Sequence, residues 1–360
     1  MNLQQLNSLI HESNSIAIFA HTCPDADALC SALAMKDFIN SNYLVKGKKS
    51  ARWYRKKVDI FVDCDEIPES LKVLAEKYKL SINPKPRNKY NLSLALDCAN
   101  IERLGKYEEL FKASEKTVNI DHHKSNTKFA EINYIIDTSS TCENLYLFFK
   151  YFERMYGAKM NNYILTQLYS GILTDTNNLE NNADRLVTRD TVSSIVGALG
   201  TKKASIIKSH FFKNLAKSKL ALTTISYNPK NRKYYEDGKI CIITLSNKAF
   251  TKAHASLEDA EGIVDSALNT EGVYISALLL EPKKGEYKVK LRGKNLKITQ
   301  IAEKFGGGGH DFMAAFDYKG NYNVLNMSLL RECKTTLATS LDSVETIEDI
   351  LEDNAETLQK

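Results

Sequence analysis

Short apolar runs alternate with amphipathic segments in the first half of the chain. The apolar runs cover residues 15–20, 57–63, 92–96 and 117–120, and helical patterns separate them, as at residues 69–78 and 102–112. Strands that alternate with helices indicate β-α-β units and a parallel sheet with right-handed crossovers. A capping box, Ser140-x-x-Glu143, predicts the start of a further helix, and another is expected over residues 163–173.

The pattern changes after about residue 195. Three strand-like segments, residues 239–245, 273–280 and 287–291, lie among helical stretches and precede a run of four glycines. We therefore expect an α/β protein with a parallel-sheet domain, a smaller α/β domain and an active-site cleft between them. The expected boundaries are 1–195 for the first domain, 196–206 for a linker, 207–328 for the second domain and 329–360 for an acidic helical tail.

The composition is that of an ordinary globular protein, with 43% hydrophobic and 26% charged residues among 360. No apolar run approaches the ~20 residues that span a bilayer, and the N-terminus lacks the pattern of a secretory signal. We therefore expect a cytoplasmic protein without membrane contact. The seven cysteines form no C-x-x-C pair, which favours reduced, mostly buried thiols over a thiolate metal site.

The net charge of +5 does not by itself require a nucleic-acid partner. One segment is strongly basic, since residues 46–57 hold seven Lys or Arg side chains, no acidic residue, and the aromatic pair Trp53 and Tyr54. Such a run can contact a polyanion by charge and stacking, but a solvated loop explains it equally well. Its role stays open.

Carboxylate and imidazole side chains gather where the predicted strands end. The positions are His21, Asp25 and Asp27 after the first strand, Asp97 after the third, Asp121, His122 and His123 after the fourth, and Asp175 at the end of the helix from residue 163. Ligands of open parallel sheets bind at this edge. Oxygen and nitrogen donors without thiolates suit Mn²⁺, Mg²⁺ or Zn²⁺.

The spacing of these residues suggests two ions. Asp25 and Asp27 lie two residues apart in a turn, so their carboxylates can diverge and serve different metals. Asp97, from another strand, could bridge a pair of ions ~3.5–4 Å apart. Each segment alone has a structural explanation, because an Asp near a helix start is usually a cap. Carboxylates or imidazoles occur together at four strand or helix ends, however, and this combination favours a metal site over four separate structural roles.

In that order these residues resemble the DHH phosphoesterase superfamily. The run Gly306–Gly309 followed by His310, with Ile301-Ala302 before it and Ala314-Ala315 after it, resembles the signature of the DHHA1 domain. The two-domain layout is similar to the stand-alone NrnA group of nano-RNases and pAp phosphatases, whose relatives degrade cyclic di-AMP and pApA. The resemblance extends over roughly residues 10–325.

The resemblance implies roles for the matching residues and two Mn²⁺ ions as cofactors, with Mg²⁺ or other divalent ions as substitutes. One ion would be held by His21, Asp25 and Asp97, and the other by Asp27, Asp97, His122 and Asp175. Asp121 would orient the ligand histidine His122, and His123 would contact the phosphate. Asp97, Asp121, His122 and His123 would therefore form the catalytic centre.

The second domain is expected to bind substrate. Gly307, Gly308 and Gly309 would let the backbone approach an anion and present N–H groups to it, and His310 would contact the phosphate or the nucleotide. Arg292 resembles the family arginine that holds a terminal phosphate or base. Gly293 stands where relatives usually have Ser, and Asn177 where they tend to have Gly. Both departures concern the substrate pocket and leave the expected metal chemistry unchanged.

The resemblance implies metal-dependent hydrolysis of short nucleotides: di- to pentaribonucleotides, pApA and pAp. A cyclic di-AMP phosphodiesterase is an alternative, and a non-catalytic nucleotide-binding sensor is an alternative of another class. The preferred substrate, the metal used in vivo and a homodimeric state all stay open. The remaining histidines, His11, His210 and His254, are interpreted as structural.

Overall fold

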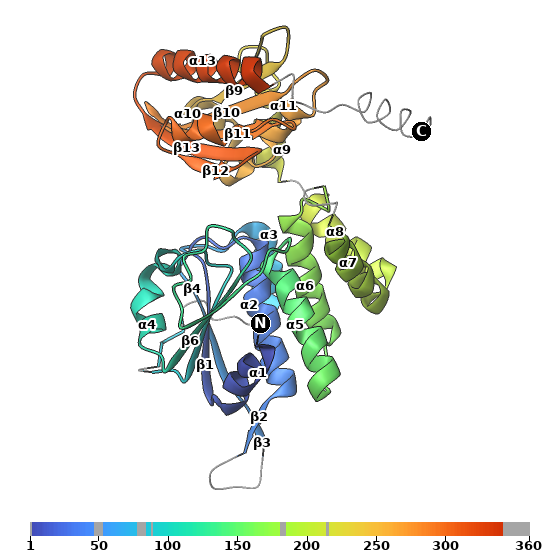
Figure 1. Ribbon diagram of the computed structural model, residues 1–360. Helices are drawn as coiled ribbons and strands as arrows, with labels where there is room; N and C mark the ends of the chain where they lie inside the picture. The colour runs from blue at the N-terminus through green and yellow to red at the C-terminus, as the bar shows by residue number, and fades with distance from the viewer. Residues whose placement is uncertain are drawn as a thin grey trace, which may run out of the picture. The chain divides into compact units, whose positions relative to one another are not determined.

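The computed structural model describes residues 2–46, 53–77, 84–87, 89–180, 185–213 and 216–340. The chain divides into two compact units, Met1–Asn214 and Leu215–Lys360 (Figure 1). Residues 196–206, the predicted linker, instead belong to helices α7 (Leu186–Leu199) and α8 (Thr201–Phe212). The division therefore lies after them, because a helical pattern rather than a loop continues through this segment.

The first unit is built on a five-stranded sheet with the order β4-β1-β5-β6-β7, and every pairing in it is parallel. The strands are β1 (Ser15–Ala20), β4 (Lys57–Val62), β5 (Leu92–Leu96), β6 (Lys116–Asp121) and β7 (Ile132–Ile135). This confirms the predicted parallel sheet. Strand β7 was not predicted, because only one of its four residues is buried and it therefore lacks an apolar run.

Helices cover both faces of this sheet (Figure 1). One core contains α1 (Leu3–Glu12), α2 (Ala26–Asn42), α5 (Thr141–Tyr156) and α6 (Asn162–Asp175), with α3 (Glu69–Lys77) also contributing. On the other face, Phe19 and Phe61 of the sheet pack against Phe111 of α4 (Glu108–Lys112). As predicted, Ser140 caps α5 by accepting a hydrogen bond from the backbone N–H of Glu143 at 3.0 Å.

The helix predicted over residues 102–112 is wrong in its first half. Residues Ile101–Tyr107 form a 3₁₀ segment that is interrupted at Gly105, where φ is 58°. A Cβ at Gly105 would meet Asp63 Oδ2 at 2.2 Å, so this close approach requires glycine. The amphipathic pattern alone does not reveal such a contact.

The second unit holds a six-stranded sheet with the order β12-β13-β11-β10-β9-β8. The strands are β8 (Arg232–Tyr235), β9 (Ile240–Leu245), β10 (Ile275–Lys283), β11 (Glu286–Gly293), β12 (Gly308–His310) and β13 (Met313–Lys319). Only β9 and β10 pair in parallel; the other pairings are antiparallel. The separate, smaller α/β domain is thus confirmed.

Helices also pack on both faces of this second sheet. On one face lie α9 (Lys217–Ser226), α10 (Asn247–Ala253) and α11 (Ile263–Leu268). On the other lie α12 (Thr299–Glu303) and α13 (Tyr322–Ser340), and α13 buries Leu325, Leu329, Cys333 and Leu337. The predicted tail of residues 329–360 therefore begins inside a core helix, and its residues 341–360 lie outside the described residues.

The basic run separates into parts with different surroundings. Strands β2 (Leu44–Lys46) and β3 (Trp53–Arg55) pair as a hairpin, and residues 47–52 lie outside the described residues. Lys56 is buried, and its ammonium donates hydrogen bonds to the carbonyls of His11 at 2.8 Å and Ser13 at 2.7 Å. Lys56 thus closes the C-terminal end of α1 and has a structural role.

The sequence predicted reduced, mostly buried cysteine thiols. All seven cysteines are free thiols, and five of them are buried. Within the part of the chain that the structure describes, no helix combines the length and apolar character that crossing a bilayer requires.

Candidate metal centre

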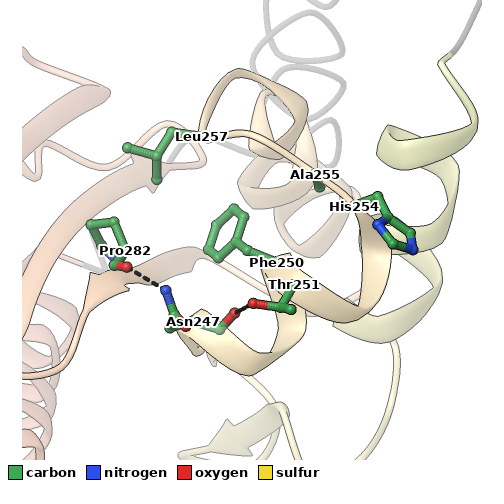
Figure 2. A pocket seen from close by; sticks show the side chains of 7 residues that line it. All are labelled: Asn247, Phe250, Thr251, His254, Ala255, Leu257 and Pro282. Carbon is green, nitrogen blue, oxygen red and sulfur yellow. Dashed lines mark hydrogen bonds between the residues drawn. The ribbon is translucent and has the colours of Figure 1, made fainter.

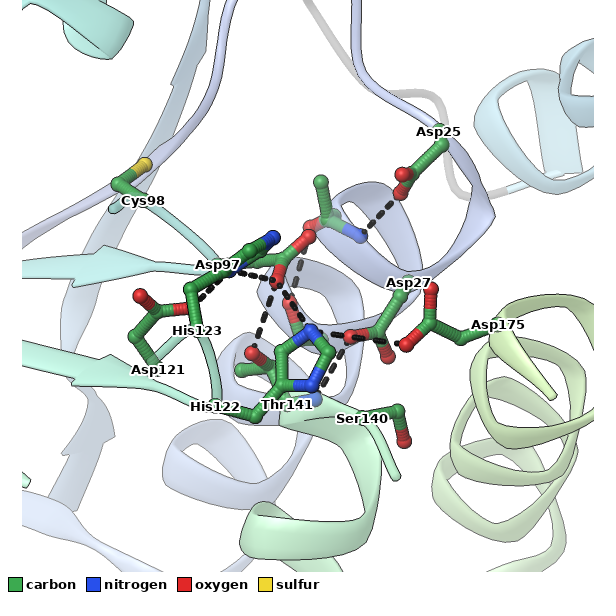
Figure 3. A network of polar contacts seen from close by, with 12 residues as sticks. Asp25, Asp27, Asp97, Cys98, Asp121, His122, His123, Ser140, Thr141 and Asp175 are labelled. Atoms are coloured by element: carbon green, nitrogen blue, oxygen red, sulfur yellow. Dashed lines mark hydrogen bonds and ion pairs between the residues drawn. The ribbon is translucent and has the colours of Figure 1, made fainter. Parts of the chain in front are cut away.

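The register of the first sheet brings the predicted polar positions to one edge. Phe19 pairs with Ala95, and Leu96 pairs with Ile120, so the carboxyl ends of β1, β5 and β6 are level. His21 and Asp97 directly follow their strands, and Asp121 is the last residue of β6. Figure 3 shows the resulting network, to which the starts of α2 and α5 and the end of α6 also contribute.

The side chains form three overlapping groups whose potential ligand atoms lie within 4.8 Å of one another. The groups are His21, Asp25 and Asp97; Asp27, His122 and Asp175; and Asp97, Asp121, His122 and His123. All six positions predicted to ligate metal are therefore close together, and Asp97 belongs to two groups. Their roles as ligands stay a prediction.

In the first group His21 Nε2 lies 3.7 Å from Asp25 Oδ2 and 3.7 Å from Asp97 Oδ2. The other ring nitrogen, Nδ1, donates a hydrogen bond to the carbonyl of Thr22 at 2.8 Å. This bond fixes the tautomer and leaves Nε2 as the nitrogen that faces the carboxylates. Asp25 also caps α2, because its Oδ1 accepts from Ala28 N at 3.0 Å. Capping and metal binding are thus compatible here.

In the second group Asp27 is held rigidly. One carboxylate oxygen accepts from Thr141 N at 2.7 Å and the other from Cys142 N at 2.9 Å, at the start of α5. The side chain is buried, and the N–H groups of this positive helix end offset part of the cost of burying its charge. Asp175 approaches the group from the end of α6, with its Oδ2 3.5 Å from His122 Nε2.

Asp97 links the groups and has an unusual backbone. Its φ is 59°, in the left-handed region that non-glycine residues rarely adopt. Its Oδ1 accepts a hydrogen bond from Thr141 Oγ1 at 3.0 Å and lies 3.5 Å from His122 Nε2. Strained conformations of this kind are concentrated at functional sites.

The carboxylate of Asp121 is hydrogen-bonded to the imidazole of His123, whereas we expected it to orient the imidazole of His122. Its Oδ1 lies 2.7 Å from His123 Nδ1, and its Oδ2 accepts from Asn126 Nδ2 at 2.6 Å. The hydrogen bond with Asp121 raises the pKa of His123 to about 9. Burial opposes ionisation of Asp121, but the bond from His123 holds the pKa of this carboxyl below its usual value. The pair is therefore an imidazolium–carboxylate pair near neutral pH.

The electrostatics of the cluster fit a divalent cation. Burial, together with repulsion from neighbouring carboxylates, raises the pKa of Asp27, Asp97 and Asp175 above the ordinary value for aspartate. Several acidic groups that repel one another in a buried place are stabilised by a positive ion. The donors are oxygen and nitrogen atoms, which suit Mn²⁺ and Mg²⁺.

Three residues that lie against the cluster were missed by sequence reasoning: Thr141, Asn126 and Gly171. The capping box predicted a helix start here, and the first N–H groups of any helix lack partners inside it. That their acceptor is Asp27 depends on packing between segments more than 100 residues apart. Asn126 and Gly171 have no signal in the sequence pattern.

The residues expected to bind substrate lie in the second unit. Arg292 of β11 and His310 of β12 both pair with Met313 of β13, so their side chains share one face of the sheet. Arg292 donates from Nε to Asp265 Oδ1 at 2.9 Å. This ion pair and a hydrogen bond from Nη1 to Leu291 O at 3.0 Å fix the guanidinium, and its remaining N–H groups are the ones left for a phosphate or base.

The glycines of the run 306–309 differ in how much space surrounds them. A Cβ at Gly307 would meet the carbonyl oxygen of Ala315 at 2.2 Å, and one at Gly309 would meet that of Met313 at 2.3 Å. The N–H of Gly307 donates to Ala302 O at 3.0 Å and is therefore already used. A Cβ at Gly308 would meet nothing within 4 Å. The fold thus requires Gly307 and Gly309, whereas Gly308 borders open space.

A separate depression of about 390 Å³ lies in the second unit, near the C-terminal end of α10 (Figure 2). It is lined by Asn247, Phe250, Thr251, His254, Ala255, Leu257 and Pro282. The amide of Asn247 is bound to Pro282 O at 2.6 Å, and Thr251 Oγ1 donates to Asn247 O at 3.1 Å. The side chains of Asn247 and Thr251 are already hydrogen-bonded, and His254 is the single histidine in the lining. The depression therefore lacks the carboxylate and imidazole groups of the cluster around Asp97.

Comparison with known proteins identifies both units. The model of the DHH family, N-terminal domain, matches residues 15–172, and the model of the DHHA1 domain matches residues 237–332. The chain thus contains a DHH-family domain followed by a DHHA1 domain. It is therefore a phosphoesterase, a hydrolase that acts on phosphoester bonds.

Similar proteins match this DHH protein along most of its length. The probable bifunctional oligoribonuclease and PAP phosphatase NrnA of Streptococcus mutans is 24% identical over 304 residues, 82% of this chain and 87% of the relative. The cyclic-di-AMP phosphodiesterase GdpP of Geobacillus thermodenitrificans is 24% identical over 85% of this chain but 45% of its own length. The structure of an exopolyphosphatase-related protein from Bacteroides fragilis has a TM-score of 0.78 at 21% identity, covering 96% and 98% of the two chains, and supports the fold.

Proposed function

We propose that this protein is a two-metal, Mn²⁺-dependent phosphodiesterase and phosphatase that hydrolyses short nucleotides. The proposed substrates are di- to pentaribonucleotides, pApA and pAp. The observation that carries the proposal is a pair of adjacent side-chain groups, His21, Asp25 and Asp97 and then Asp27, His122 and Asp175, each with potential ligand atoms within 4.8 Å of one another. The two groups adjoin where Asp97 Oδ1 lies 3.5 Å from His122 Nε2. The likeness to the oligoribonuclease and PAP phosphatase NrnA over 82% of the chain supports the substrate class.

The ligand sets follow the geometric groups. His21, Asp25 and Asp97 would hold one divalent ion, and Asp27, His122 and Asp175 would hold the other. Asp97 is proposed as a ligand of this second ion too, because its Oδ1 lies 3.5 Å from His122 Nε2. Bound ions at such a site supply Lewis-acid charge compensation and an activated water for in-line attack on phosphorus. The chain itself supplies the fixed orientation of these donors through the hydrogen bonds of Thr22, Thr141 and Cys142.

His123 has a separate part in the proposed reaction. Its Nδ1 is engaged with Asp121, so Nε2 is the ring donor for a non-bridging or leaving oxygen of the phosphate. Because the pKa of His123 is raised to about 9, the imidazole carries its proton at neutral pH. A protonated donor is what developing negative charge on oxygen requires. In the second unit, Arg292 and His310 are proposed to bind the nucleotide.

A cyclic di-AMP phosphodiesterase is the second candidate, because GdpP matches 85% of this chain. The candidate of another class is a nucleotide-binding sensor without activity. Rates measured side by side with Mn²⁺ on pAp, pApA, cyclic di-AMP and a short oligoribonucleotide distinguish them. We expect turnover of the three linear substrates. Hydrolysis restricted to cyclic di-AMP would favour the second candidate, and binding without turnover of any substrate or of a bis-aryl phosphate would favour the sensor.

Asp97→Ala tests the two-metal assignment directly. The variant removes a carboxylate shared by two groups, so we expect it to lose hydrolysis of pApA while remaining folded. Circular dichroism and thermal unfolding in EDTA check the fold. Cleavage of pApA at the wild-type rate by the folded, Mn²⁺-supplied variant would show that the assignment is wrong.

A further inference from the structure

Gly171 occupies a position where the helix itself favours another residue. It lies inside α6, where glycine costs about 1 kcal/mol relative to alanine. It is buried, and it lies one turn before Asp175 on the same helix face, because residues four apart are neighbours. A buried glycine in a helix interior indicates a close approach of other atoms.

The atoms that approach Gly171 belong to two other helices. A Cβ at this position would lie 2.3 Å from Cys142 Sγ of α5 and 2.7 Å from Asp27 Oδ1 of α2. Both distances are shorter than side-chain contacts allow. The absence of a side chain at Gly171 therefore lets α2, α5 and α6 pack closely together. This contact lies next to Asp27, a proposed metal ligand.

Neither neighbour can move aside easily. Asp27 accepts hydrogen bonds from Thr141 N at 2.7 Å and Cys142 N at 2.9 Å, and Asp27 and Cys142 are at most 1% exposed. Displacing this carboxylate would leave two buried N–H groups without an acceptor, which costs about 1–3 kcal/mol for each group. A side chain at position 171 would therefore push α6 away or force Asp27 out of place.

We propose that Gly171 is a positioning residue that sets the separation between Asp27 and Asp175. Close contact at Gly171 brings α6 near enough for Asp175 to join Asp27 and His122 around one divalent cation. The proposal rests on the proposed two-metal site and adds to it a residue that touches neither ion nor substrate. A methyl group at position 171 would increase the distance between the carboxylates of Asp27 and Asp175 and weaken cation binding by Asp27, His122 and Asp175. The group of His21, Asp25 and Asp97 would keep its geometry.

The test is calorimetric titration of metal-free protein with Mn²⁺ alone, without substrate. We expect two binding events in the wild type and, in Gly171→Ala, loss of one event or its weakening by about 10-fold or more, the range seen for residues that support ligands. The remaining event should disappear on adding Asp25→Asn. Gly197→Ala is the matched control, because Gly197 lies in α7 with nothing within 4 Å of a Cβ. It should keep both events.

Two outcomes of the titration separate the proposals. If the wild type binds no Mn²⁺, the proposed two-metal function fails. If the wild type and folded Gly171→Ala both bind two ions with equal affinity, the positioning role of Gly171 is overturned while the two-metal site stands.

A second pair of variants, Cys142→Ala and Gly171→Ala/Cys142→Ala, keeps the test informative if Gly171→Ala alone does not fold. Cys142→Ala removes the sulfur that makes the shortest contact, so Gly171→Ala/Cys142→Ala keeps mainly the conflict with Asp27. We expect Cys142→Ala alone to bind two ions and the double variant to be folded but deficient in one. If the double variant is unfolded in EDTA, or is folded and binds both ions, Gly171 serves helix packing and the proposal is overturned.

Discussion

His123 Nδ1 lies 2.7 Å from Asp121 Oδ1 in the described structure. Asp121 is completely buried, whereas the side chain of His123 is 34% exposed. A buried carboxylate therefore holds one ring nitrogen of an imidazole whose other side is exposed at the site. The two neighbouring histidines differ in their nearest carboxylates. His122 Nε2 lies 3.5 Å from both Asp97 Oδ1 and Asp175 Oδ2, whereas His123 Nδ1 lies 3.7 Å from Asp97 Oδ1 and much closer to Asp121.

Asp121→Asn should lower the pKa of His123 from about 9 towards its ordinary value of 6.5, because an amide cannot stabilise the imidazolium charge. An NMR titration of metal-free protein measures this change. We also expect turnover at neutral pH to fall by roughly 10- to 100-fold. Asp59→Asn is a suitable control, because Asp59 pairs with Arg87 and Tyr90 outside the cluster. An unchanged His123 titration would contradict the assigned pairing.

Asp175→Asn should stabilise the metal-free protein at neutral pH. Burial and repulsion from Asp27 raise the pKa of Asp175 well above its ordinary value. A raised pKa means that the folded state binds the proton more tightly, so its stability is complete below the unfolded pKa of about 4 and is lost as pH rises through the folded pKa. The uncharged amide avoids this loss.

Thermal unfolding in EDTA at several pH values checks this prediction. At pH 7.5 the variant should melt a few degrees above the wild type, since about 1 kcal/mol corresponds to 2–4 °C for a domain of this size, and the difference should shrink towards pH 4. Saturating Mn²⁺ should reverse the order, because it binds the intact site more tightly. A variant that melts below the wild type in EDTA at pH 7.5 would refute the electrostatic argument.

Gly308 and Gly307 should respond oppositely to substitution by valine. Gly307→Val places a side chain against the carbonyl oxygen of Ala315, so we expect a loss of stability of about 2 kcal/mol or more. Gly308→Val projects into open space and suits a strand, so stability should stay equal or rise by up to about 1 kcal/mol.

The same pair tests substrate binding. If the face shared with Arg292 and His310 receives a nucleotide, Gly308→Val should raise the KM for pApA and leave turnover of a small bis-aryl phosphate unchanged. Kinetics on both substrates and thermal unfolding provide the measurements. An unchanged KM for pApA would remove Gly308 from the substrate-binding residues.

Lys56→Met should destabilise the protein without affecting RNA affinity. The substitution leaves the carbonyls of His11 and Ser13 without their buried donor, at a cost of about 1–3 kcal/mol. Lys57→Met is the matched control, because Lys57 is exposed at the start of β4 and its loss should leave the melting temperature unchanged. Chemical denaturation and titration with a short oligoribonucleotide measure the two effects. Equal stability of both variants would contradict the structural role of Lys56.

The sequence by itself determined the elements that follow local rules. Apolar runs marked β1, β4, β5 and β6, and the capping box marked the start of α5, because strand burial and helix capping depend on nearby residues. It also determined the chemistry available at the strand ends, since parallel strands bring residues such as His21, Asp97 and Asp121 to one edge. Most of the candidate metal ligands therefore follow from the order of β-α units in the sequence.

Only the tertiary structure decided how these residues are held. The sequence did not reveal that Asp121 contacts His123, that α5 donates two N–H groups to Asp27, or that Gly171 provides the space between three helices. Nor did it distinguish Gly308 from Gly307, because four identical letters give no information about which Cβ would clash. Such features depend on contacts between segments far apart in the chain, and their distances are set by packing rather than by local pattern.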